Sequence, residues 1–254
     1  MKIGYYSDLH LEFQGLEIKN DEADVIVLAG DIHLGDQGVK WAADTFKQPV
    51  VAVAGNHEAY TRQNVNLDQI LYSMRLAAKG TNVHVLNNES IVIDGVNFIG
   101  STLWSDFNLY GRPKLSMQLA LGMINDYSLI KLPTEQMINR LFTPNDALTL
   151  FQEAMQFIQS AIEPEKENII ITHYGVDERC SHPQFHGDDL SAAFNSNLSE
   201  FITNNRESIS AWIYGHTHHN LDFEIAGIPI ITNQRGYAPY DEVPEFDECK
   251  LLSV

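Results

Sequence analysis

Apolar residues along this chain fall into two patterns, one typical of buried strands and the other of helices. Runs of four or five consecutive apolar residues, many of them β-branched, predict strands that are buried on both faces. Such strands are predicted at residues 25–29, 48–54, 168–172 and 210–214, and a further strand is predicted to begin at Lys2. Strands of this kind are typical of α/β proteins.

Apolar residues at helical spacing, several preceded by cap residues, predict helices between these strands. The predicted helices span residues 38–46, 66–78, 143–162 and 194–202. Weaker patterns predict further strands at residues 83–86, 90–93, 96–99, 221–225, 228–232 and 249–254. Residues 238–248 are acidic and contain two prolines, which predicts a loop.

We expect one domain spanning residues 1–254. Residues 101–147 differ from the rest, because aromatic residues alternate with scattered polar ones and prolines interrupt any regular pattern. We expect this stretch to be a helical excursion that covers the functional site like a lid.

Residues able to bind metal ions follow each of the four buried strands and the strand that begins at Lys2. In open α/β sheets, ligands bind just beyond the carboxyl ends of the strands. Residues two apart in an extended chain point the same way, so Asp8 and His10 can face one point. The most specific run is Gly55-Asn56-His57-Glu58, which places an amide, an imidazole and a carboxylate on one tight turn. The strand-end residues are Asp8, His10, Asp31, Asn56, His57, His173, His216 and His218.

Other histidines and cysteines have plainer interpretations. His33 belongs to a second Asp-x-His sequence, and both a loop position and a functional role are open for it. His84 alternates within a predicted strand, which is typical of a structural histidine. Cys180, His182 and His186 lie in an irregular segment, where a separate zinc site competes with the favoured interpretation of ordinary loop histidines.

The chain has 34 acidic against 16 basic side chains, which gives a net charge of −18. Such a surface repels nucleic acid and anionic lipid, so a nucleic-acid partner is disfavoured. No apolar run reaches membrane-spanning length, and residues 1–8 lack the long apolar region of a signal peptide. We therefore expect a cytoplasmic protein with two unpaired cysteines and no membrane partner. A small anionic substrate would need a cationic site, which bound metal ions can supply.

The strand-end donors are oxygens and imidazole nitrogens, without a thiolate. This donor set favours Mn, Fe or Zn over Cu(I) or an iron–sulfur cluster. Seven ligands exceed the needs of one tetrahedral ion. They suffice for two divalent transition-metal ions that share a bridging carboxylate.

The ordered motifs resemble the calcineurin-like metallophosphoesterase superfamily. The residues that carry the resemblance are Asp8-x-His10, Gly30-Asp31, Gly55-Asn56-His57-Glu58, His173 and Gly215-His216-x-His218. Flanking residues, such as Ala192-Ala193-Phe194, are similar to those of compact bacterial and phage members. The chain departs from the pattern at Tyr174-Gly175, where histidine and a small residue or proline are expected, and at Gln234, where proline is expected. These departures concern details of the substrate pocket.

The resemblance implies a four-layer α/β/β/α sandwich with two mixed sheets and a metal site at the strand ends. It implies one ion held by Asp8, His10, Asp31 and His218. A second ion would be held by Asp31, Asn56, His173 and His216, so that Asp31 bridges the two.

We expect a phosphoesterase that hydrolyses phosphomonoesters or phosphodiesters, small anionic substrates, through attack of a metal-bridging hydroxide. His57, which neighbours a ligand but is outside the ligand set, is expected to protonate the leaving group. Arg235 is a candidate phosphate clamp, and a structural salt bridge is the alternative. A metal-independent scaffold and a nuclease of the same superfamily are the competing functions. The oligomeric state is open.

Overall fold

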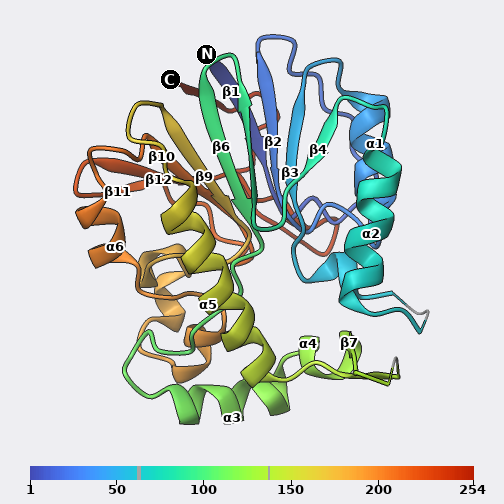
Figure 1. The fold of residues 1–254 in the computed structure, drawn as a ribbon, viewed down its shortest axis with the longest axis vertical. Coiled ribbons are helices and arrows are strands. Elements are labelled where there is room, and N and C mark those ends of the chain that lie inside the picture. Colours follow the sequence, from blue (N-terminus) through green and yellow to red (C-terminus); the bar gives the residue numbers. More distant parts are fainter. Residues whose placement is uncertain (62–63, 137) are drawn as a thin grey trace.

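Two sheets packed face to face form the centre of the computed structural model, which describes residues 1–61, 64–136 and 138–254 (Figure 1). The first sheet has the order β15-β1-β2-β3-β4, with four parallel strands and β15 antiparallel at one edge. Its strands are β1 (Lys2–Tyr6), β2 (Val25–Ala29), β3 (Val50–Val53), β4 (Val83–Val85) and β15 (Leu251–Ser253).

The second sheet has the order β11-β12-β10-β9-β6-β5. Its four central strands are parallel, and β5 and β11 are antiparallel edges. Its strands are β5 (Glu89–Ile93), β6 (Val96–Ser101), β9 (Asn168–Thr172), β10 (Ala211–Tyr214), β11 (Phe223–Ile225) and β12 (Ile228–Thr232).

Helices cover the outer faces of both sheets. Figure 1 shows α1 (Gln37–Thr45) and α2 (Leu67–Ala78) beside the first sheet, and α5 (Pro144–Ala161) and α6 (Ser199–Asn204) beside the second. One apolar cluster fills the space between the sheets, and two others lie beneath the helices. The predicted four-layer sandwich is therefore confirmed.

Local sequence explains where these elements begin. Val25–Ala29 is at most 1% exposed at every residue, as a continuous apolar run predicts for a strand covered on both faces. Helix α2 starts at a capping box in which the side chains of Asn66 and Gln69 each accept the other's backbone N–H. Helix α5 starts in the same way at Thr143, followed by proline at its first position.

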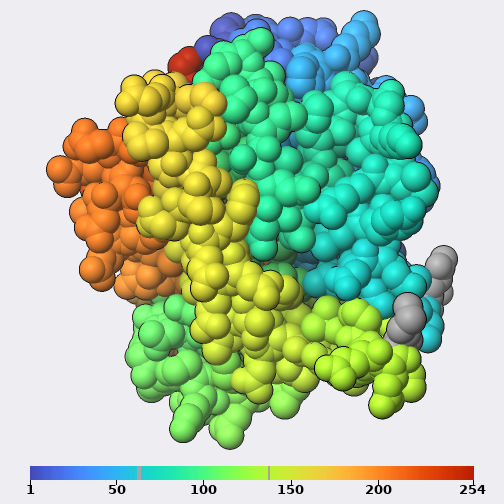
Figure 2. Space-filling model, viewed as in Figure 1, coloured from blue at the N-terminus to red at the C-terminus, as the bar shows by residue number. Residues whose placement is uncertain are grey.

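The excursion at residues 101–147 lies at the end of the sheets opposite the two chain termini (Figure 1). It contains α3 (Pro113–Met123), α4 (Asp126–Leu129) and a small hairpin of β7 (Lys131–Pro133) and β8 (Asn139–Leu141), while residue 137 lies outside the described residues. Figure 2 shows this part packed against α5. The hairpin corrects the expectation of a purely helical stretch.

Two other predicted elements differ from the structure. The helix expected over residues 194–202 begins only at Ser199, because the apolar Phe194 packs against His216 instead of continuing a helical face. Within the predicted loop at residues 238–248, β14 (Asp241–Glu242) pairs with β13 (Gly236–Tyr237). Among the described residues, no helix combines the length and apolar character that crossing a membrane requires.

Candidate metal centre

The carboxyl ends of β1, β2, β3, β9 and β10 meet at one end of the two sheets, because all five strands run in the same direction within their sheets. Each of these strand ends carries residues that the sequence predicts as ligands. The packing of one sheet on the other therefore brings together side chains that are far apart in the sequence, such as His10 and His218, which are 208 residues apart.

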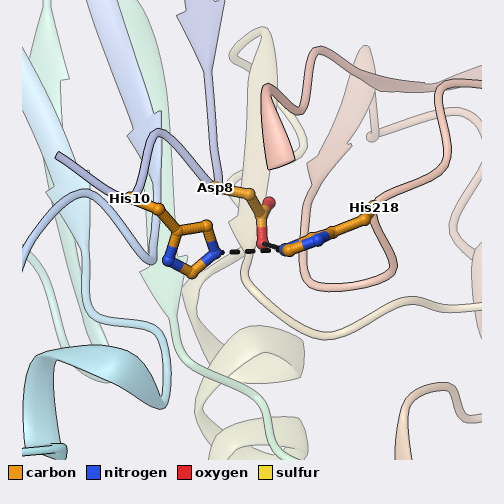
Figure 3. Close-up of side chains that lie close together, drawn as sticks. All are labelled: Asp8, His10 and His218. Carbon is orange, nitrogen blue, oxygen red and sulfur yellow. Dashed lines mark hydrogen bonds and ion pairs between the residues drawn. The ribbon is translucent and has the colours of Figure 1, made fainter. Parts of the chain in front are cut away.

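Asp8, His10 and His218 form one group, which we call the first half-site (Figure 3). His10 Nε2 lies 3.1 Å from His218 Nε2, and His218 Nε2 lies 3.4 Å from Asp8 Oδ1. The backbone N–H of His216 donates to both oxygens of Asp8, at 3.0 and 2.9 Å. The carboxylate is thereby fixed between the two sheets.

Asn56, His173 and His216 lie next to Asp31 and form what we call the second half-site. His173 Nε2 is 3.1 Å from Asn56 Oδ1 and 3.3 Å from Asp31 Oδ2. The rings of His173 and His216 have centroids 4.9 Å apart. Asp31 Oδ2 also lies 3.9 Å from His10 Nε2, so this carboxylate stands between the two half-sites.

The backbone at five of the seven predicted ligands is left-handed. The φ angles are 51° at Asp8, 44° at His10, 55° at Asp31, 74° at His216 and 48° at His218. Residues with a Cβ rarely adopt such angles, and those that do are held there by surrounding contacts, most often at functional sites. These ligand positions are therefore determined by tertiary contacts.

Two glycines allow the strand ends to approach one another. A Cβ atom on Gly55 would overlap Asp31 Oδ1, and one on Gly215 would lie 2.5 Å from Asp8 Oδ2. Any side chain at either position would displace a predicted ligand. The glycines that precede the ligands are thus required by close approach.

The hydrogen bonds of His10 and His173 leave ring nitrogens that are suited to bind cations. His10 Nδ1 lies 3.1 Å from Glu12 Oε1, and His173 Nδ1 lies 2.9 Å from the Ala29 carbonyl oxygen. Because these acceptors hold the proton on Nδ1, each neutral ring carries its lone pair on Nε2. The Nε2 lone pair of His10 then faces the ring nitrogen of His218. A divalent metal ion would satisfy these nitrogens, so the residues present fit metal ions.

Charges of the residues at the two half-sites compensate one another. Burial disfavours the Asp31 carboxylate, but the neighbouring His173 and His57 outweigh it and hold the Asp31 pKa well below its usual range. Burial also disfavours protonated His173, but Asp31 and Asp8 raise its pKa to about 10. Burial and the adjacent His173 lower the pKa of His216 well below its ordinary value. His216 is therefore neutral, whereas a metal must displace a proton from His173.

His57 lies beside the ligands and lines the same cavity. Its backbone N–H donates to Asp31 Oδ1 at 2.8 Å, its Nδ1 lies 3.3 Å from Glu12 Oε1, and its Nε2 lies 3.2 Å from the Tyr237 hydroxyl oxygen. Burial opposes the charged ring, but the Asp31 and Glu12 carboxylates raise the pKa of His57. The raised pKa favours a protonated ring, as a general acid requires.

Glu58 ties two of the ligand loops together. This buried carboxylate accepts the backbone N–H groups of Asp31 at 3.2 Å, Ile32 at 2.9 Å and Gly55 at 2.7 Å. Burial and the neighbouring Asp31 raise its pKa to about 8. The Glu58 side chain therefore links the loop after β2 to the loop after β3.

A buried carboxylate from the excursion reaches one of the predicted ligands. Asp126, at the start of α4 and 2% exposed, accepts hydrogen bonds from Asn56 Nδ2 at 2.9 Å, from the Tyr174 hydroxyl at 3.0 Å and from the Tyr60 hydroxyl. The Tyr174 ring in turn stacks on His216, with centroids 4.0 Å apart. Tyr174, the departure noted in the sequence, therefore connects the excursion to the second half-site.

Sequence reasoning assigned no role to Glu12, Tyr60, Asp126 or Tyr237. Glu12 continues the two-residue spacing of Asp8 and His10, and that spacing is a signal that could have found it. Asp126 and Tyr237 have no local signal, because their partners are distant in the chain, and the Asp126 carboxylate to which Tyr60 donates is 66 residues away. Asp126, for example, is 70 residues from Asn56.

Arg235 is 3% exposed, and its contacts match the alternative role of a structural salt bridge. Its guanidinium donates to the Gln14 carbonyl at 2.8 Å and to the Leu9 carbonyl at 3.4 Å, and it pairs with Glu242 at 3.2 Å. These bonds join the loop after β1 to the β13–β14 ladder. The role of phosphate clamp stays a prediction, with this geometry against it.

The irregular segment after β9 does not gather a further set of ligands. Among the described residues, ligand-type side chains converge in three groups, none of which includes Cys180, His182 or His186. Cys180 is buried, and burial raises its thiol pKa to about 12. His33 Nδ1 accepts the Leu34 backbone N–H at 2.7 Å, as in a local turn.

Comparison with known proteins identifies the family. The family model described as calcineurin-like phosphoesterase matches residues 1–220. A relative, the uncharacterized protein L509 of Acanthamoeba polyphaga mimivirus, is 29% identical over 262 residues, which cover 92% of this chain and 90% of the relative. The solved structure of phosphopantetheinyl hydrolase from Mycobacterium tuberculosis superimposes with a TM-score of 0.68 at 16% identity, covering 98% of each chain, which shows the shared fold. This chain therefore belongs to the calcineurin-like phosphoesterase family.

Proposed function

We propose that the chain is a binuclear-metal phosphoesterase. The observation that carries the proposal is the position of Asp31, whose Oδ2 lies 3.9 Å from His10 Nε2 in one half-site and 3.3 Å from His173 Nε2 in the other. Asp8, His10, Asp31 and His218 would hold one ion, and Asp31, Asn56, His173 and His216 the other. When bound, two divalent cations would supply positive charge to the phosphoryl group and lower the pKa of the attacking water.

The chain's own contribution to the chemistry centres on His57. Glu12 accepts from Nδ1 and thereby fixes the orientation of the ring, so that the protonated form of His57 presents its Nε2 proton for transfer. We propose that His57 donates it to the leaving-group oxygen.

We also propose that residues 101–147 act as a lid within a single domain of residues 1–254. Met123 and Ile124, at the end of α3, line the cavity that contains His57 and the predicted ligands. Asp126 contacts Asn56 from the same segment. The lid would bound the substrate on one side and support a ligand on the other.

Metal content and leaving-group dependence test this proposal. Protein loaded with Mn²⁺ should hold two ions per chain and hydrolyse p-nitrophenyl phosphate or its bis ester. A chain that binds no metal and hydrolyses neither ester would support the scaffold alternative, whereas activity confined to nucleic acid would support the nuclease.

His57→Asn should retain both ions but lose activity by roughly 10²- to 10⁴-fold, the usual contribution of general acid catalysis. The loss should be smaller for p-nitrophenyl esters than for alkyl esters, because a good leaving group needs little protonation. An equal loss for both kinds of ester, with metal intact, would contradict the general-acid role. Loss of a metal ion would instead make His57 a ligand.

A further inference from the structure

The cavity above the two half-sites is larger than a phosphoryl group requires. Its volume is 730 Å³, and its lining includes Asp31, Asn56, His216 and His218. Pockets of roughly 300–1,000 Å³ are typical of sites that enclose a drug-sized molecule. A substrate that fills this cavity must therefore carry a substantial organic group beside its phosphoryl group.

One wall of the cavity is a row of aromatic rings that begins at the first half-site. The centroid of the Tyr237 ring lies 4.4 Å from the ring centroids of both His10 and His218. Phe13 stands nearly perpendicular to Tyr237 at 5.5 Å, and Tyr240 nearly perpendicular to Phe13 at 6.3 Å. Phe13 is 48% exposed and Tyr240 80% exposed, so both offer free ring faces. We call Tyr237, Phe13 and Tyr240 the aromatic row.

A second group of apolar residues in the cavity lining begins at the second half-site. The Phe194 ring stacks on His216, with centroids 4.9 Å apart and 26° between planes. Leu190, Ile124 and Met123 complete this group, and Met123 is 66% exposed. Each half-site thus adjoins its own apolar surface, Tyr237 at the first and Phe194 at the second.

Two apolar surfaces suit a phosphodiester better than a monoester, because a diester carries an organic group on each of two ester oxygens. A diester also has one negative charge, where a monoester carries up to two, and this chain has a net charge of −18. Exposed aromatic rings bind planar, uncharged rings by stacking or edge-to-face contact. We propose that the substrate is a phosphodiester whose non-leaving alcohol carries an uncharged aromatic ring that packs on the aromatic row. This inference rests on the proposed function.

A nucleoside base and an aryl group share this chemistry, and three diesters with one leaving group distinguish them. These are the methyl, phenyl and thymidine-5′ esters of 4-nitrophenyl phosphate. Because 4-nitrophenolate leaves in every case, the ratio of kcat/KM values reports only the other ester group. The phenyl or the thymidine ester, or both, should exceed the methyl ester by roughly 5- to 150-fold, the range that ring stacking contributes.

The possible failures are distinct. Equal kcat/KM for all three diesters would overturn the aromatic subsite and leave the phosphoesterase proposal standing. Faster hydrolysis of 4-nitrophenyl phosphate than of every diester would overturn the diester assignment. No hydrolysis of any of the four compounds by protein that holds two metal ions would overturn the proposed function itself.

Substitutions in the aromatic row test where the ring binds. Phe13→Ala and Tyr240→Ala should each lower the phenyl-to-methyl ratio several-fold, since each removes one exposed ring face. Tyr72→Ala is the matched control, because Tyr72 is 68% exposed on α2 and is absent from the cavity lining. Tyr72→Ala should leave the ratio unchanged. If the two cavity variants lower both rates in equal proportion, the aromatic ring does not bind this row and the inference is wrong.

Discussion

The two half-sites contain similar donors but are held in place by different parts of the chain. In the first, His10 is oriented by Glu12, two residues further along the same loop, and the His218 backbone N–H donates to the Gln234 side chain at 2.6 Å. In the second, Asn56 is oriented by Asp126, which belongs to the excursion. Metal binding at the second half-site should therefore depend on how the excursion is folded, and binding at the first should not.

The amide of Asn56 explains why this dependence matters. An asparagine side chain can present either its oxygen or its NH₂ group to a metal, and only the oxygen can be a ligand. The Asp126 carboxylate accepts and cannot donate, so it draws the NH₂ group and turns Oδ1 toward His173. Tyr60 and Tyr174 donate to the same carboxylate and thereby fix it. The excursion thus sets the chemical identity of one ligand atom.

The largest effect is expected at the residue that the half-sites share. Asp31→Asn should lower the metal occupancy of both half-sites and reduce activity to background. The neutral amide lacks the negative charge with which the carboxylate would bridge two cations. Anomalous diffraction from crystals grown with Mn²⁺ reports the occupancy at each half-site separately. Full occupancy of both half-sites in this variant would remove Asp31 as the bridge and would make the two half-sites independent.

An intermediate effect should separate the half-sites. Asp126→Asn replaces an acceptor by a group that can donate to Asn56 Oδ1, and should weaken metal binding at the second half-site alone. Loss of a residue that orients a ligand typically costs about 10- to 100-fold in metal affinity. The measurement is a Mn²⁺ titration combined with anomalous diffraction at limiting metal.

Glu12→Gln is the reciprocal variant, and it should weaken metal binding at the first half-site while sparing the second.

Asp106→Asn serves as the control for Asp126→Asn, because Asp106 also lies in the excursion but its side chain accepts the Asn108 backbone N–H. It should change neither half-site. Equal weakening of both half-sites by Asp126→Asn would show that the excursion supports the whole site and would refute the asymmetry.

Whether interacting residues are close together or far apart in the sequence also decides what could be predicted from it. The buried strands are found within about two residues of their predicted ends, since a continuous apolar run such as Val25–Ala29 is a local property. The ligand positions follow from the strands, because parallel strands deliver their carboxyl ends to one edge. Both levels depend on short stretches of sequence.

Contacts that depend on distant segments escaped prediction. Asp126 and Asn56 meet only when the excursion folds back over the sheets, and no spacing in the sequence records that contact. The apolar spacing from Phe194 onward suggested a helix, but Phe194 packs on His216 across the site. Arg235 was left between two roles because two of its three partners, the carbonyls of Leu9 and Gln14, are more than 200 residues away.

The smallest expected effect concerns protons at the second half-site. In the metal-free protein, Asp31 and Asp8 outweigh burial and raise the pKa of His173 to about 10, against about 6.5 in the unfolded chain. A pKa raised on folding stabilises the folded state fully below about pH 6.5, and this stabilisation is lost as the pH rises toward 10. The metal-free protein should therefore become less stable over this interval, while the second half-site gains metal affinity because fewer protons compete. The ¹⁵N chemical shifts of the imidazoles, assigned with His173→Asn, should show His173 still protonated at pH 8 without metal. Titration of His173 near pH 6.5 would contradict this expectation. The second half-site would then differ from the first only in its contact with Asp126.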